Sequence, residues 1–118
     1  MQKLLEQCSV WSLRQAYTTV FNEVRSHPEV VQRLERAYIL LSRDMEYSIE
    51  RVGSKDLLQF SISSPNGGYT VVPSQQRCTC PDAQQGQYCK HRLAIRLLLL
   101  ALKGSHQTKM ARELEQSR

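Results

Sequence analysis

Apolar residues in the first third of the chain recur at the three- and four-residue spacing of an amphipathic helix. This spacing predicts one helix over residues 2–26 and a second over residues 29–43, with Pro28 in the first turn of the second helix. Ser12 begins a short stretch that resembles a capping box, so a break in the first helix is expected near residues 9–12. We therefore expect this part of the chain to be helical and to end before residue 45.

Several side chains in this helical region have an expected position. Cys8 and Trp11 fall on the apolar face of the first helix, so we interpret both as core residues rather than as a further ligand or a stacking platform. Glu29 and Arg33 form a favourable i, i+4 pair, which predicts that Arg33 lies toward the outside of the second helix. His27 has no partner in the sequence that would make it a ligand, and we expect it at the surface or in a loop.

From residue 45 the apolar pattern changes to the two-residue alternation of half-buried strands. Turn residues over 53–56 and 64–68 separate the alternating stretches, and the second of these turns contains Asn-Gly-Gly. The expected strand residues are Tyr47 and Ile49, then Leu58, Phe60 and Ile62, then Tyr69–Val72, and finally Gln75–Cys80. This order predicts an antiparallel meander of about four strands.

Residues 90–103 predict a helix that is apolar around most of its circumference. Such a helix has to be covered on more than one side, and the sheet and the N-terminal helices can each cover one. Gly104 suits the position after the last helical residue, with Lys103 at the favourable end of the dipole. A last short, polar helix is expected over residues 107–116.

The predicted fold class is α+β, with N-terminal helices, an antiparallel β-meander and a C-terminal helix. We divide the chain into an N-terminal helical segment (1–44) that packs on a central module (45–104), followed by a short C-terminal helix or tail (105–118). No apolar run approaches the roughly 18 residues that a membrane helix needs. The N-terminus lacks the apolar stretch of a signal peptide, so the expected location is the cytoplasm, or the nucleus in a eukaryote.

Four residues with the side chains of a zinc site fall within a short stretch. Cys78-x-Cys80 is followed, after eight residues, by Cys89-x-His91. Three thiolates and one imidazole are a common ligand set of closed structural zinc sites. Three cysteines and a histidine would also hold iron, but no further cluster motif is present, and a chance grouping without metal is disfavoured by the spacing. Asp82, the nearest carboxylate, is more simply a turn or outer-sphere residue than a catalytic base.

The predicted elements bring these four residues together. Cys78 and Cys80 project from one face of the fourth strand, and Arg77 projects from the other. Cys89 is expected just before the apolar helix and His91 in its first turn, because positions i and i+2 of a helix do not face each other. One structural zinc would then join the end of the sheet to the start of the helix in a ββα unit.

The charge of the chain is concentrated in and after this stretch. Residues 1–75 contain eight basic and eight acidic side chains, whereas residues 76–118 contain eight basic and three acidic ones. The whole net charge of +5 therefore lies in the second part. Such an asymmetry points to a polyanionic partner, although small basic proteins without one are also common.

The cysteine–histidine stretch resembles the SWIM zinc finger, whose pattern is C-x-C, a spacer of variable length, and C-x-H. Pro81, Lys90 and the apolar residues that follow also fit, and the resemblance covers roughly residues 45–103. It implies that Cys78, Cys80, Cys89 and His91 are the zinc ligands. It also implies a module that binds DNA or mediates protein contacts, as in small partners of recombination or repair proteins and of mobile elements, rather than an enzyme.

Two functions are compatible with the sequence. In the first, basic residues contact the phosphates of nucleic acid, in particular DNA, with weak, salt-dependent affinity and without base specificity. Arg92, Arg96 and Lys103 lie within about 40° of one line along the predicted helix. Arg77 and Lys90, with Lys109 and Arg112 further on, extend this surface.

In the second function the chain is a protein–protein interaction adaptor with the zinc site as its scaffold. The N-terminal helices or the leucine-rich helix would then contact a protein partner or a second copy, and the basic stripe would be the solvated side of a helix. A hydrolase is disfavoured, because no nucleophile–base set, paired-carboxylate motif or glycine-rich phosphate loop is present. No small-molecule substrate and no membrane partner are expected.

Overall fold

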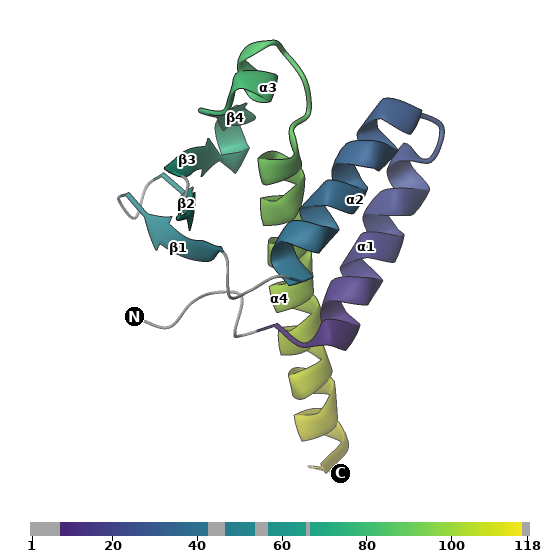
Figure 1. Ribbon diagram of the computed structural model, residues 1–118. Coiled ribbons are helices and arrows are strands. Elements are labelled where there is room, and N and C mark those ends of the chain that lie inside the picture. The colour runs from purple at the N-terminus through teal and green to yellow at the C-terminus, as the bar shows by residue number, and fades with distance from the viewer. Residues whose placement is uncertain (1–7, 43–46, 54–56, 66, 117–118) are drawn as a thin grey trace.

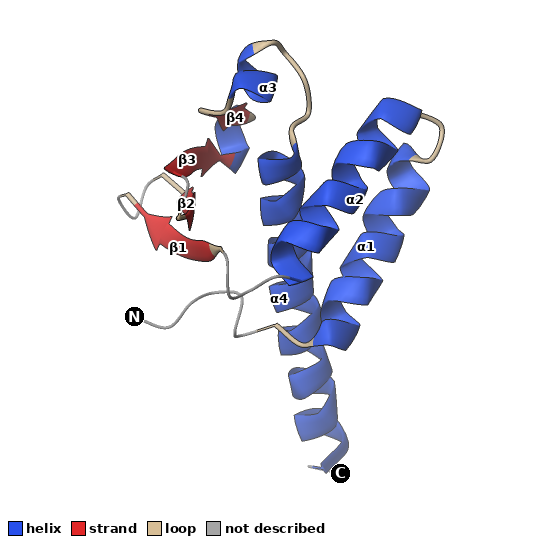
Figure 2. Cartoon of the chain, in the orientation of Figure 1, coloured by secondary structure: helices blue, strands red, loops and turns tan. Residues whose placement is uncertain are grey.

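A computed structural model describes residues 8–42, 47–53, 57–65 and 67–116 of the chain, with side chains up to residue 103. Three helices and a small sheet make up most of this part (Figures 1 and 2). The elements are α1 (Val10–Val24), α2 (Pro28–Ser42), β1 (Ser48–Val52), β2 (Gln59–Ser64), β3 (Gly67–Val72), the 3-10 turn η2 (Pro73–Gln75), β4 (Arg77–Cys78), α3 (Pro81–Gln84) and α4 (Lys90–Gln116). The predicted α+β class is confirmed.

The strands form the predicted antiparallel meander, in the order β1-β2-β3-β4. Ile49 pairs with Ile62, and Ile62 pairs in turn with Tyr69 on β3. Residues that pair directly across antiparallel strands point to the same face. A second row on that face runs from Phe60 through Val71 to Cys78. The register therefore places Tyr69 and Cys78 on the buried face of the sheet.

Helix α4 is the centre of the fold (Figure 1). The sheet packs beside its first turns, and α1 and α2 form a layer that covers another side. This explains why Leu93 and Leu98 are both fully buried although they point in different directions around the helix. Burying a leucine side chain contributes roughly 1.5–3 kcal/mol. We infer that α4 holds the helical layer and the sheet in one core.

The break expected near residues 9–12 is present, because α1 begins at Val10, and the cap is Ser9 rather than Ser12. The backbone N–H of Ser12 donates to the Ser9 hydroxyl at 3.0 Å. Residues 1–7, which the predicted helix included, lie outside the described part. The interpretation of Trp11 as a core residue is wrong, since 61% of the residue is exposed. In the first turn only Ser12 and Leu13 face α4, and Trp11 lies outside the buried stripe that continues through Ala16 and Val20.

Two further boundaries differ from the prediction. Helix α4 does not end at Gly104 but continues to residue 116, so the separate helix over 107–116 is wrong. A glycine inside a helix costs only about 1 kcal/mol, which a well-packed helix can absorb. The fourth strand is limited to residues 77–78, because η2 and the left-handed Gln76 (φ 53°) precede it. In the described part, no helix is both long enough and apolar enough to span a membrane.

Candidate metal centre and the adjacent groove

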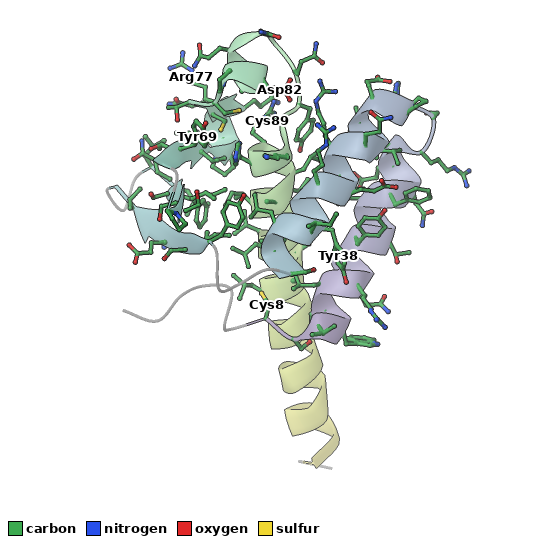
Figure 3. All side chains as sticks on the ribbon, in the orientation of Figure 1. Cys8, Tyr38, Tyr69, Arg77, Asp82 and Cys89 are labelled. Atoms are coloured by element: carbon green, nitrogen blue, oxygen red, sulfur yellow. The ribbon has the colours of Figure 1, made fainter. Side chains whose placement is uncertain are left out.

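The four predicted ligands lie together at the end of the sheet. The ligand atoms of Cys78, Cys80, Cys89 and His91 are all within 4.8 Å of one another, and all four side chains are buried. Cys78 ends β4, Cys80 precedes α3, Cys89 precedes α4, and His91 is in the first turn of α4. The predicted connection between sheet and helix is therefore present in the structure (Figures 1 and 3).

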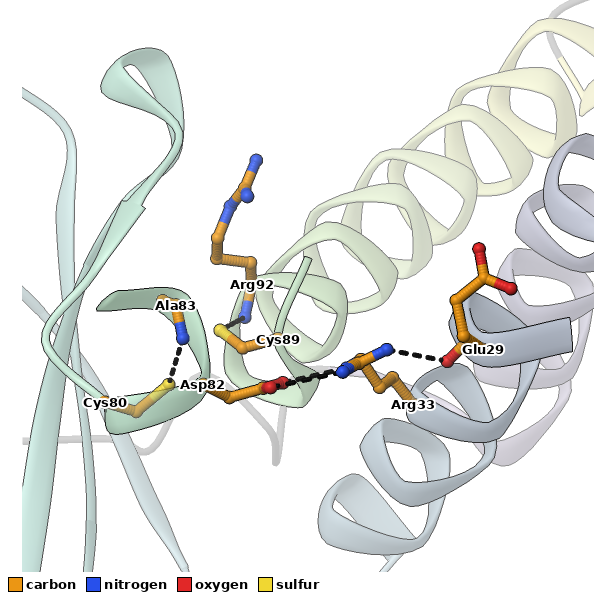
Figure 4. A network of polar contacts seen from close by, with 7 residues as sticks. All are labelled: Glu29, Arg33, Cys80, Asp82, Ala83, Cys89 and Arg92. Atoms are coloured by element: carbon orange, nitrogen blue, oxygen red, sulfur yellow. Dashed lines mark hydrogen bonds and ion pairs between the residues drawn. The ribbon is translucent and has the colours of Figure 1, made fainter. Parts of the chain in front are cut away.

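Two of the sulfur atoms accept hydrogen bonds from the start of a helix. The N–H of Ala83 donates to Cys80 Sγ, and the N–H of Arg92 donates to Cys89 Sγ, each at 3.4 Å (Figure 4). Such donors stabilise a thiolate more than a neutral thiol. Proline at position 81 suits the first turn of α3, which the sequence did not predict. The backbone is thus arranged to favour negative charge on both sulfurs.

Without a metal ion, proton sharing among the cysteines favours negative charge on the Cys89 sulfur alone. The pKa of Cys89 is lowered well below its ordinary value, chiefly because the Cys78 thiol donates a hydrogen bond to it and despite burial. The pKa of Cys78 is raised, first by that hydrogen bond and then by burial. Burial also raises the pKa of Cys80. A cation bound by all three sulfurs would replace these shared protons.

His91 provides an independent test of whether a metal fits. Its Nδ1 atom is buried and has no hydrogen-bond partner in the described part of the protein. A buried nitrogen without a partner is costly, and a metal ion beside three sulfurs would give it one. Cys78, Cys80, Cys89 and His91 are therefore positioned to hold one zinc ion. Four protein ligands close a tetrahedral site, so zinc here would supply structure and leave no open position for a substrate.

Asp82 connects the metal loop, the stretch over residues 78–91 that contains the four ligands, to the N-terminal helices. Arg33 of α2 donates from Nε to Oδ2 at 2.8 Å and from Nη2 to Oδ1 at 3.2 Å (Figure 4). These hydrogen bonds are the main reason that the pKa of Asp82 is lowered. Arg33 was expected toward the outside of α2; its guanidinium instead reaches Asp82, and its Nη1 also donates to the Glu29 backbone carbonyl at 3.1 Å. The expectation that Asp82 is an outer residue of the site agrees with this position.

An open groove of about 540 Å³ lies beside the metal centre. One wall comes from α2, the opposite wall from β2 and β3, and the floor from the metal loop and the first turn of α4. Its charged and aromatic lining side chains are Arg33, Arg36, Tyr47, Tyr69, Asp82, Lys90 and His91. The groove therefore combines cationic and aromatic side chains.

The five predicted nucleic-acid-binding residues come from β4 and α4. Arg77 and Lys103 are exposed, and Arg77 is the first residue of β4, at the edge of the sheet (Figure 3). Arg92 stacks on the Tyr88 ring at 4.2 Å, and Arg96 forms an ion pair with Glu23 of α1. Lys90 lines the groove, far around the helix from Arg92 and Arg96. Lys109 and Arg112 lie beyond the described side chains.

His27 and Cys8 have the positions expected from the sequence. His27 is exposed, with Nδ1 3.9 Å from a Glu29 carboxylate oxygen. Cys8 is half-buried against the core, as expected, and its thiol donates to the carbonyl of Leu98 at 4.0 Å. Sequence reasoning missed Arg36 and Tyr69, which line the groove. Tyr69 and Val71 are two residues apart on β3, and this spacing is a sequence signal that Tyr69 shares the buried face of the sheet. Arg36 has no such signal, because it resembles any solvated helix residue.

Comparison with known proteins gives one match. Residues 69–97 match the family model of the SWIM zinc finger. The match begins in β3 and ends in α4, so it contains all four ligands and leaves α1 and α2 outside. No curated protein and no solved structure matches the chain.

Proposed function

Because residues 69–97 form a SWIM zinc finger, we propose that this chain is a nucleic-acid-binding module, with DNA as its main partner. A SWIM zinc finger is a binding module rather than a catalytic family. In this proposal the zinc ion holds basic side chains in place and takes no part in chemistry. Phosphate contacts provide the affinity, and base edges are not recognised.

The uneven distribution of charge is the observation that carries this proposal. Between residues 76 and 103 the chain has five basic side chains and a single acidic one. That acid, Asp82, is already engaged by Arg33. Among the described residues, Arg77 on β4 and Lys90 and Lys103 on α4 have no ion pair within 4 Å. Zinc with three thiolates adds a net charge of only about −1.

The position of α4 decides what kind of contact is possible. A recognition helix must protrude to enter the major groove of DNA. The first turns of α4 are instead enclosed, because His91, Leu93 and Ala94 are all buried. The enclosed position of α4 therefore argues against base recognition by this helix. It is consistent with phosphate contacts made by the surface around the helix.

A salt series on the zinc-loaded protein tests the proposal. Fluorescence anisotropy with single- and double-stranded DNA and RNA should show affinity that falls steeply with salt. For duplex DNA, the slope of log K against log salt should decrease by about 0.9 for each contacting cation that is removed. Arg77→Gln and Lys103→Gln are suitable variants, and Arg14→Gln on α1 is the matched control. Binding that is absent at low salt, or insensitive to salt, would contradict the proposal.

A second candidate function is protein interaction, and one observation favours it. Val10 and Trp11 are 68% and 61% exposed at the start of α1. This end of the helical layer is remote from the metal loop (Figure 1). Exposed large apolar side chains of this kind are common in protein interfaces. Self-association or partner binding that Trp11→Ala abolishes, together with no nucleic-acid binding, would favour this function.

A further inference from the structure

We propose that the groove beside the metal centre binds single-stranded nucleic acid, with a base stacked on Tyr69 and adjacent phosphates held by Arg36 and Lys90. This inference rests on the proposed function and specifies the form of nucleic acid and its contact site. It differs from the surface predicted from the sequence, because Arg36 and Tyr69 were not part of that surface.

The size and construction of the groove fit this ligand. Its volume of about 540 Å³ lies within the roughly 300–1,000 Å³ typical of small-molecule sites, which is enough for one nucleotide unit. Arg36 comes from α2, Tyr69 from β3 and Lys90 from the start of α4. Three elements that pack around one metal centre therefore present the two cations and the aromatic ring, so the groove needs no loop closure to form.

Tyr69 has the position of a stacking platform. It lies on the inner face of the sheet, opposite Ile62, but it is 37% exposed. Its ring lies 4.7 Å from the His91 ring, centroid to centroid, with a tilt of 43° between the planes. His91 thus supports the tyrosine ring from the metal side, and the rest of the ring is open to the groove. Stacking of one base on such a ring is worth about 1–3 kcal/mol.

The charges in the groove favour a phosphate chain, but only modestly. Arg33 is neutralised by Asp82, whereas Arg36 and Lys90 have no ion pair within 4 Å among the described residues. A zinc-loaded centre on the floor carries a net charge of about −1. The two unpaired cations outweigh it, so we expect weak binding. Two phosphate contacts to a single strand give a salt slope of about −1.4.

The shape of the site distinguishes a single strand from a duplex. Tyr69 lies within a groove between α2 and the sheet, not on a projecting surface. The bases of a duplex are stacked on each other, and their faces are not available to a side chain unless the base is flipped out. Only an unpaired base can stack on this ring while its phosphates reach Arg36 and Lys90.

Anisotropy titrations with a 12-nucleotide oligothymidylate, the matching oligouridylate and a duplex of the same length test the proposal. We expect either single strand to bind more tightly than the duplex. Tyr69→Leu should weaken single-strand binding roughly ten-fold or more, and Tyr69→Phe should keep it within about two-fold, because only the ring is needed. Arg36→Gln with Lys90→Gln should reduce the salt slope for a single strand by about 1.4, and Arg14→Gln is the matched charge control. Zinc content is measured for every variant.

Photo-crosslinking of the unmodified protein provides a readout that does not depend on how a variant folds. An oligonucleotide with 5-iodouracil should crosslink to Tyr69, because the reaction favours an aromatic ring close to the base. Crosslinks that lie only outside the groove would overturn the proposal. Duplex binding that is stronger than single-strand binding and unaffected by Tyr69→Leu would overturn it while leaving the proposed function intact. Absence of binding to all three nucleic acids would contradict both.

Discussion

The ion pair between Arg33 and Asp82 makes a quantitative prediction about how the zinc finger and the helices depend on each other. The pair has two hydrogen bonds, and the two side chains are 21% and 39% exposed. Exposed pairs contribute about 0–1 kcal/mol, and breaking a buried pair costs about 3–5 kcal/mol. For this partly buried, bidentate pair we expect a coupling energy of about 1 kcal/mol, at the upper end of the exposed range.

A double-mutant cycle of Arg33→Gln and Asp82→Asn measures this coupling. Urea unfolding of the zinc-loaded protein should be followed by far-UV circular dichroism, because Trp11, the single tryptophan, is 61% exposed and a poor reporter of unfolding. Asp82 belongs to the helix that begins next to the ligand Cys80. The same substitutions should therefore weaken zinc binding by about five-fold, measured by competition with a chromophoric chelator.

Arg36→Gln is the matched control for stability, since Arg36 lies on the same helix, is exposed and forms no ion pair in the described part of the chain. Its free energy of unfolding should stay within about 0.5 kcal/mol of the unmodified protein. The reasoning is refuted if the coupling between positions 33 and 82 is below about 0.3 kcal/mol, the level at which independent sites simply add.

Three other predictions concern Phe60, Trp11 and Cys8. Phe60→Ala should destabilise the protein by about 3–5 kcal/mol, because Phe60 is buried in the sheet, whereas Trp11→Ala should change the free energy of unfolding by no more than about 0.5 kcal/mol. A large loss for Trp11→Ala in urea titrations would place this side chain in a core after all. Burial raises the pKa of Cys8 to about 11, so its alkylation by iodoacetamide near neutral pH should be about 100-fold slower than that of an unfolded thiol. The folded state holds this proton more tightly, so its contribution to stability falls as the pH rises above the unfolded value of about 8.5; equal alkylation rates would contradict the assignment.

The parts of the fold that were predictable are those with a strong local pattern. The change from helical to two-residue periodicity located the meander, and the cysteine–histidine spacing located the metal centre. The apolar circumference of residues 93–102 correctly indicated a helix enclosed from several sides. In each case one stretch of sequence contains the whole signal, so no tertiary information was needed.

The remaining features depend on contacts between distant residues. The pairing of Arg33 with Asp82 joins positions 49 residues apart, and nothing local distinguishes Arg33 from Arg36. The groove appears only when α2, β3 and α4 are assembled, so the alternation along β3 indicated on which face Tyr69 lies but not that this face lines a groove. At Gly104 the local sequence was misleading. A glycine often ends a helix, but α4 continues through this residue because the rest of the helix is stable enough to absorb its cost.

Native mass spectrometry with metal analysis tests the central claim, a single structural zinc ion, most directly. The chain should carry one zinc ion, and Cys89→Ala should lose both the zinc and the cooperative unfolding transition, because the site joins the sheet to the central helix. Ser12→Ala, away from the site on α1, should retain the metal. A protein that folds cooperatively without any bound metal would contradict the account.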